Sequence, residues 1–231
     1  DMAAIVALAL MIRALVLDFD GVIADTEGPE FRAWVATWAD YGHELTLEEW
    51  VQCIGTNDPD GWDPLRELGR RVGDGFDPDE ATRRRRARHH PAIHELTDPL
   101  PGIVDLLDQA DDAGLATAIA SSSGDDWVPV LLEQLRLTHR FAHVSIFDGT
   151  CPAKPAPDLY LRACAALGVE PHEAVAFEDS PNGIAAAKAA GLWCVAVPHE
   201  ITRELDLSGA DLVIPTLDGA TLDDLFARLG C

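Results

Sequence analysis

Short apolar runs alternate with longer segments of helical periodicity over most of the chain. Apolar runs bounded by Gly, Pro or Asp are typical of buried strands, and apolar residues that recur every three or four positions indicate helices packed on them. The predicted strands are 14–17, 115–120, 144–147, 174–177, 193–197 and 212–214, and the predicted helices between them are 102–113, 127–135, 157–167 and 183–190. This order predicts an α/β fold with a doubly wound parallel sheet covered on both faces.

The pattern changes between residues 25 and 97, where no strand is predicted. Apolar positions keep a helical spacing there, at Phe31, Trp34, Val35 and Trp38 and again at Leu47, Trp50, Val51 and Ile54. We therefore expect an inserted helical cap domain, with hinges at 24–27 and in the Pro- and Gly-containing segment 97–102. The tryptophans of this stripe are expected in the core of the cap rather than against a substrate.

The predicted domains are a sheet core at 11–24 and 98–231, the cap at 25–97 and an N-terminal extension at 1–10. The apolar segment that begins the chain is too short to cross a bilayer and follows no positive charge, so we expect neither a membrane span nor a secretory signal. Met11 is a candidate start for the chain proper.

Composition excludes some classes of partner. The 231 residues are 48% hydrophobic and 25% charged, as in globular proteins, and the formal net charge is −23. Such acidity argues against nucleic-acid and membrane partners. The five cysteines are odd in number and form no Cys-x-x-Cys pair, which predicts free thiols and a cytoplasmic location. A monomer or weak homo-oligomer is expected.

Two carboxylates follow the first predicted strand. In Asp18-Phe19-Asp20-Gly21 both acids point to the same side of an extended chain, and Gly21 lets the backbone turn just beyond them. Two acids at one spot repel each other unless a cation or a shared proton is present. The segment therefore indicates a metal site or an acid/base pair, with a turn that caps the strand as the alternative.

Two further segments carry groups that bind anions. Ser121, Ser122 and Ser123 follow the second strand, where hydroxyls and N–H groups can cradle an anion, although such a sequence is also an ordinary turn. Lys154, one of only two lysines, precedes a proline-rich segment. If it is half-buried its ammonium should face anions, and an exposed loop lysine is the alternative.

A fourth segment, Glu178-Asp179-Ser180-Pro181-Asn182, follows the fourth strand. Because carboxylate oxygens suit Mg²⁺, one acid from this segment and Asp18 would form a reasonable magnesium site. Asp179, Ser180 or Asn182 could instead cap the next helix. The carboxyl ends of parallel strands meet at one edge of a sheet, so all four segments are expected to converge there.

The four segments, in this order, resemble the motifs of the haloacid dehalogenase-like hydrolase superfamily, in the helical-cap branch near β-phosphoglucomutase and the sugar phosphatases. The motifs are Asp18-Phe19-Asp20-Gly21-Val22, Ser121, Lys154-Pro155 and Glu178-Asp179. The resemblance covers nearly the whole chain and implies a Rossmann-like core. It also implies Mg²⁺-dependent hydrolysis of a small phosphorylated metabolite, such as a sugar phosphate, as the activity.

The resemblance implies a role for each matched residue. Asp18 would attack phosphorus to give an aspartyl-phosphate, and Asp20 would protonate the leaving alcohol and later deprotonate water. Asp18, Asp179 and the backbone carbonyl of Asp20 would bind Mg²⁺, with Glu178 close by. Ser121 and Lys154 would hold the phosphoryl oxygens. Further substrate contacts are expected from Ser122, Glu30, Gly55 and Asn182.

Two other functions are considered. Phe31-Arg32-Ala33-Trp34 resembles β-phosphoglucomutase, but Glu30 stands where that enzyme has a histidine, and residues 54–58 lack the Lys and Arg with which it grips a second phosphate. A phosphatase is therefore favoured over a sugar phosphomutase. A non-catalytic phosphosugar-binding module would be marked by loss of Asp18, Asp20, Lys154 or Asp179, and all four are present.

Two polar clusters in the cap are expected to face solvent. Arginines at 83–86 and 88 would run around a helix and so cannot form one binding face. We interpret them as part of a solvated helix whose charge balances local acids, although one arginine could reach an anionic substrate. His90 and His94 have the spacing of metal ligands on a helix, but no third ligand is evident. We therefore interpret residues 89–94 as the surface of the cap.

Overall fold

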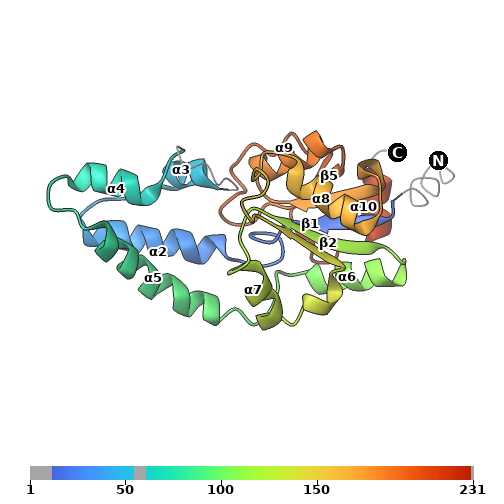
Figure 1. The fold of residues 1–231 in the computed structure, drawn as a ribbon, viewed down its shortest axis with the longest axis horizontal. Coiled ribbons are helices and arrows are strands. Elements are labelled where there is room, and N and C mark those ends of the chain that lie inside the picture. Colours follow the sequence, from blue (N-terminus) through green and yellow to red (C-terminus); the bar gives the residue numbers. More distant parts are fainter. Residues whose placement is uncertain (1–11, 55–60, 230–231) are drawn as a thin grey trace.

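The computed structural model describes residues 12–54 and 61–229, which form a six-stranded parallel sheet covered by helices, with a helical cap at one end (Figure 1). The strand order is β3-β2-β1-β4-β5-β6. The strands are β1 (Ala14–Leu17), β2 (Ala116–Ser121), β3 (His143–Ile146), β4 (Ala174–Glu178), β5 (Trp193–Ala196) and β6 (Leu212–Val213). The predicted α/β fold is confirmed, and each strand ends within one residue of its predicted bounds.

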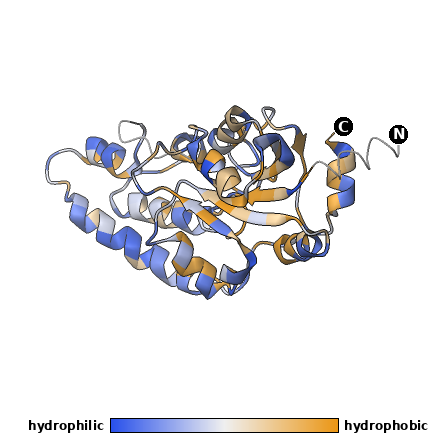
Figure 2. Cartoon of the chain, turned by 45° about the vertical axis from the view of Figure 1, so that its right-hand side comes forward, coloured by the Kyte–Doolittle hydropathy of each residue, from blue (hydrophilic) through white to orange (hydrophobic). Residues whose placement is uncertain are grey.

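The two faces of the sheet bury side chains of different size. On one face large residues such as Leu15, Leu17 and Phe177 pack against α6 (Ile103–Asp112), α7 (Val128–Gln134) and α10 (Leu222–Arg228). On the other face the strands present mainly alanines, which pack against α8 (Asp158–Leu167) and α9 (Pro181–Ala190). The strands are the most hydrophobic elements in Figure 2. Of these five helices, α10 is absent from the sequence-based prediction.

The cap consists of α2 (Glu27–Asp40), α3 (Leu47–Trp50), α4 (Pro64–Val72) and α5 (Pro78–His94). Its helices surround a hydrophobic cluster separate from those of the sheet, in which Trp34, Trp38 and Trp50 are buried as expected. The two segments that connect the cap to the sheet core lie side by side, and the Leu100 N–H of the second donates to the Ile23 carbonyl of the first at 2.8 Å.

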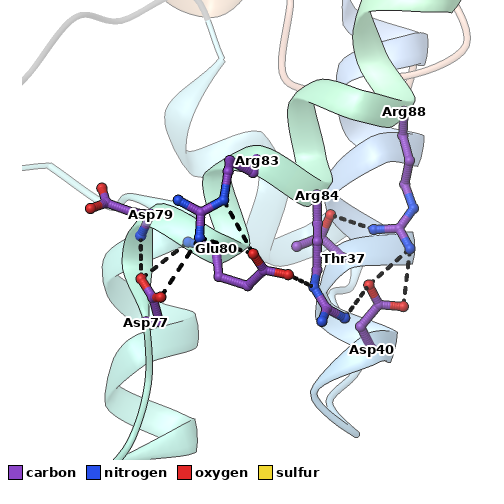
Figure 3. A network of polar contacts seen from close by, with 8 residues as sticks. All are labelled: Thr37, Asp40, Asp77, Asp79, Glu80, Arg83, Arg84 and Arg88. Carbon is purple, nitrogen blue, oxygen red and sulfur yellow. Dashed lines mark hydrogen bonds and ion pairs between the residues drawn. The ribbon is translucent and has the colours of Figure 1, made fainter.

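The arginines of α5 are largely occupied by ion pairs on the outer face of the cap. Glu80 accepts from Arg83 and Arg84, while Arg84 and Arg88 both reach Asp40 of α2 (Figure 3). α5 is mainly hydrophilic (Figure 2). For these three arginines the interpretation as a solvated helix that balances local acids agrees with the structure, whereas Arg85 turns the other way, as described below.

None of the helices in the described part of the chain has the length and apolar character that a bilayer crossing needs. Cys53, Cys151, Cys164 and Cys194 are free thiols, as predicted. The N-terminal extension 1–10, Gly55 and Cys231 lie outside the described residues. The cytoplasmic location and the oligomeric state stay predictions.

Candidate active site

A buried ammonium joins two carboxylates at the carboxyl edge of the sheet. Asp18 follows β1 directly and is held in register by its N–H, which donates to the Phe177 carbonyl of β4 at 2.9 Å. Lys154 Nζ lies 2.7 Å from Asp18 Oδ1 and 2.6 Å from Glu178 Oε1. Lys154 is only 3% exposed, so the alternative of a solvated loop lysine is wrong.

Glu178 is fully buried, and its carboxylate is surrounded by donors. Tyr160 OH donates to Oε1 at 2.6 Å, and the Asp179 N–H donates to Oε2 at 3.2 Å. Gly183 on α9 leaves room for this carboxylate, because a Cβ on residue 183 would lie 2.0 Å from it. Ser180, not Asp179 or Asn182, caps α9 by accepting from the Gly183 N–H. Both oxygens of Glu178 therefore already have protein partners.

Asp179 is also buried, but its carboxylate is less satisfied. Its Oδ2 lies 3.0 Å from His199 Nε2, and neither atom has a hydrogen-bond partner in the described structure. Gly21, with φ +82°, turns the backbone against this pair, since a Cβ there would lie 2.3 Å from Asp179 Oδ2. Side-chain oxygens of Asp18, Glu178 and Asp179 all lie within 4.8 Å of one another.

Burial sets the protonation of these acids. It raises the pKa of Asp18 well above its ordinary value, even though Lys154 pulls it down, and it also raises the pKa of Asp179. Burial alone would lower the pKa of Lys154, but the carboxylates of Asp18 and Glu178 outweigh it and raise that pKa. One ammonium thus faces three buried carboxyl groups, so ionisation of all three leaves an excess of negative charge.

The excess charge fits a divalent cation. Mg²⁺ prefers carboxylate and carbonyl oxygens, and it keeps several waters. Asp18 and Asp179 both line the cavity described below, whereas Glu178 does not. The donor set therefore fits Mg²⁺ held by Asp18 and Asp179, with Glu178 holding Lys154.

Asp20 lies in the same cavity and is held by three short hydrogen bonds. Thr26 Oγ1 and Trp127 Nε1 donate to Oδ1 at 2.6 and 2.8 Å, and Ser123 Oγ donates to Oδ2 at 2.6 Å. Ser121 Oγ is more distant, at 3.5 Å. The carboxylate is therefore fixed between the hinge of the cap and the loop after β2.

The loop that begins with Ser121, Ser122 and Ser123, here called the serine loop, lies where the sequence predicts it. Ser121 ends β2, is 1% exposed and accepts from the Ser123 N–H at 3.0 Å. Ser122 Oγ accepts from the Lys154 N–H at 3.2 Å, which links this loop to the one that carries the lysine. Both serines line the cavity beside Asp18.

A cavity of about 580 Å³ separates the core from the cap. Its cap wall includes Glu30, Arg85 and His89. Glu30 Oε2 accepts from Arg85 Nη1 at 3.0 Å and lies 3.2 Å from His89 Nε2. His89 stacks on Trp127, with ring centroids 5.6 Å apart. The interpretation of residues 89–94 as cap surface is therefore wrong for His89, which is 5% exposed, because Trp127 covers it.

Most predicted site residues meet in this cavity, but some do not. Asp18, Asp20, Ser121, Ser122, Lys154, Asp179 and Glu30 line it. Asn182 instead donates to the Ile54 carbonyl at 3.0 Å, a bond from the core to the cap. Gly55 cannot be placed, and Glu178 lies behind Lys154.

Other residues line the cavity that were not predicted from the sequence as site residues, among them Glu27, Cys53, His89 and Trp127. Burial, and then the carboxylates of Asp20 and Asp179, raise the pKa of Glu27 well above its ordinary value. Burial also raises the pKa of the Cys53 thiol to about 12, which argues against a nucleophilic thiolate. Trp127 was the one of these that the sequence could have indicated, because a large aromatic side chain four residues after Ser123 is expected to pack near that loop.

Comparisons with known proteins identify a family and several similar chains. A family model described as haloacid dehalogenase-like hydrolase matches residues 15–197. The protein YhcW of Bacillus subtilis (strain 168) is 40% identical over 195 residues, which are 84% of this chain and 87% of YhcW. The β-phosphoglucomutase of the same organism is 32% identical over 219 residues (91% and 92%). The fructose-1-phosphate phosphatase YqaB of Escherichia coli (strain K12) is 30% identical over 183 residues (79% and 95%).

A solved structure of similar architecture holds phosphate. It is the crystal structure of CbbY from Rhodobacter sphaeroides in complex with phosphate, which is 30% identical to this chain. The two superpose with a TM-score of 0.69, over 89% of this chain and 95% of CbbY.

Proposed function

This chain belongs to the haloacid dehalogenase-like hydrolases, and on that premise we propose that it is a Mg²⁺-dependent phosphatase of a small phosphorylated metabolite, namely a sugar phosphate. The observation that carries the proposal is the buried cluster of Asp18, Lys154 and Asp179 at the base of a cavity that the cap covers. The names of the relatives support phosphate esters as the substrate class.

In the proposed reaction Asp18 forms a bond to phosphorus as the bond from phosphorus to the ester oxygen breaks, which gives an aspartyl-phosphate. Protonated Asp20 gives its proton to the leaving oxygen. The resulting carboxylate then takes a proton from water, whose oxygen attacks phosphorus and releases phosphate and the Asp18 carboxylate. The hydrogen bonds from Thr26, Ser123 and Trp127 orient Asp20 for both transfers.

Lys154 and the serine loop provide the positive and polar groups around the phosphoryl oxygens. Lys154 offsets the charge of Asp18 at 2.7 Å, so that an anionic ester can approach a carboxylate. Asp18, Asp179 and the Asp20 carbonyl would hold Mg²⁺, which when bound neutralises charge on the transferred group.

The test is phosphate release from a panel of sugar phosphates, with and without Mg²⁺. Asp18→Asn should abolish release, because the amide does not attack phosphorus. Asp125→Asn is the matched control, since Asp125 is an exposed acid that does not line the cavity. Release that persists in Asp18→Asn, or that is unaffected by a chelator, would contradict the proposal.

The same panel separates the phosphatase from a sugar phosphomutase, which the similarity to β-phosphoglucomutase keeps as the second candidate. Isomerisation of a hexose 1-phosphate to the 6-phosphate is followed in parallel with release. Release without isomerisation supports the phosphatase. Isomerisation with little release would favour the mutase.

A further inference from the structure

The cap wall of the cavity carries an arginine whose charge is already balanced. Arg85 Nη1 donates to Glu30 Oε2 at 3.0 Å, and the two side chains are 19% and 24% exposed. Glu30 Oε1 in turn accepts from Trp34 Nε1 at 3.0 Å, which fixes the carboxylate from its own helix. A partly buried pair of this kind presents little net charge to a ligand.

Among the described residues of this wall, no other side chain supplies positive charge. Burial lowers the pKa of His89, even though Glu30 opposes it, so the imidazole is neutral at pH 7. Glu27 and Asp20 add further acid groups. Among the described residues that line the cavity, Arg85 and Lys154 are the only lysine or arginine side chains, and Lys154 is engaged by Asp18 and Glu178.

The same wall has unused hydrogen-bonding capacity. Arg85 Nε and His89 Nε2 are both buried and have no hydrogen-bond partner in the described structure. Buried polar atoms of this kind are normally satisfied, so a bound molecule or water is expected to satisfy them. Hydroxyl groups suit the site, because each one can both donate to a carboxylate and accept from an N–H group.

We propose that Glu30 is a specificity-determining residue that makes this end of the cavity select neutral hydroxyl groups and reject a second phosphate. The inference rests on the proposed phosphatase function and narrows its substrate to monophosphates of polyhydroxy compounds. A second phosphate would bring two more negative charges toward Glu30, and among the described residues that line the cavity no unpaired lysine or arginine is present to receive it. A sugar hydroxyl would donate to Glu30 and accept from Arg85.

The test compares two ligands that differ only in the second phosphate. Hydrolysis of p-nitrophenyl phosphate with Mg²⁺ reports on the core site, and a hexose 1-phosphate and the 1,6-bisphosphate of the same hexose are added as competitors. In the wild-type enzyme the inhibition constant of the monophosphate should be at least tenfold lower than that of the bisphosphate. Glu30→Gln, which keeps the shape and removes the charge, should reduce that ratio by tenfold or more.

Glu48→Gln is the control, because it makes the same change of net charge at an exposed position of the cap that does not line the cavity. It should leave the ratio unchanged. The specificity proposal is overturned if the bisphosphate competes equally well in the wild type, if Glu30→Gln leaves the ratio as it was, or if neither sugar competes. Absence of p-nitrophenyl phosphate hydrolysis would instead overturn the proposed phosphatase function itself.

Discussion

Replacing Lys154 with methionine tests how much the buried ion pairs of Lys154 with Asp18 and Glu178 stabilise the protein. The lysine is 3% exposed, and its ammonium lies within 2.7 Å of both Asp18 and Glu178. Methionine has a similar reach but no charge. Lys154→Met therefore leaves two neighbouring carboxylates buried without the cation that compensates them, and it leaves the packing around the side chain nearly unchanged.

The cost follows from the burial of the pair. Removing one partner of a buried ion pair costs about 3–5 kcal/mol, because the charge that remains is uncompensated. For a chain of this size each kcal/mol lowers the melting temperature by about 2–4 °C, so a decrease of about 6–20 °C is expected. An added Glu178→Gln change removes one of the uncompensated charges and should recover part of this loss.

The assay is calorimetric unfolding at pH 7 without added metal, on the single variants and on the double variant. Lys188→Met is the matched control, because Lys188 pairs with Asp211 at 2.6 Å while its side chain is 36% exposed. Surface pairs of this kind contribute about 0–1 kcal/mol. The reasoning would be refuted if Lys154→Met lost no more stability than Lys188→Met, or if Glu178→Gln made the Lys154 variant still less stable.

Three further predictions concern single positions. Trp127→Phe removes a hydrogen bond to Asp20 worth about 1.5–3 kcal/mol, so kcat for a sugar phosphate should fall tenfold or more. The leaving group of p-nitrophenyl phosphate needs less protonation, so kcat for that ester should fall less, and equal losses for the two esters would contradict this. Gly183→Ala places a methyl group 2.0 Å from a buried carboxylate and should cost about 1–3 kcal/mol in denaturant unfolding; an unchanged midpoint would count against it. Hydrogen bonds from Arg70 and Arg71 of α4 lower the pKa of Glu67 to about 2. The Glu67 carboxylate therefore stabilises the folded protein above pH 4.5, the pKa of a glutamate in the unfolded chain, and this stabilisation is lost as pH falls toward 2. Glu67→Gln should flatten this part of a plot of melting temperature against pH, and parallel curves would argue against the assignment.

The strands and the catalytic edge could be predicted from sequence for a simple reason. Each buried strand is a short apolar run that ends at polar residues, and the ends of parallel strands meet at one edge. This placed Asp18, Ser121 and Asp179 together without any coordinates. The helix α10 was not predicted because it is short, although its N-cap Thr221 and the acids of its first turn favour a helix.

The cap wall could not be predicted in the same way. Arg83, Arg84 and Arg85 are chemically identical in the sequence, and only the rotation of α5 against α2 decides which of them faces the cavity. Likewise, His89 is buried by Trp127, which lies far along the chain in the core. Contacts across the cavity depend on how the cap and the core meet, and a periodic pattern in one segment carries no such information.

The register of β1 has a consequence for how the chain is made. Its residue Ala14 pairs with Ala116 on one side and Ala174 on the other, so both neighbours are distant in sequence. At roughly 5–20 residues per second, a ribosome needs roughly 8–30 s after β1 before β4 is synthesised. The cap helices, whose contacts are more local, can form during that interval. Of the six described strands, the one that ends at the candidate nucleophile is thus synthesised first, and both of its neighbours in the sheet follow later.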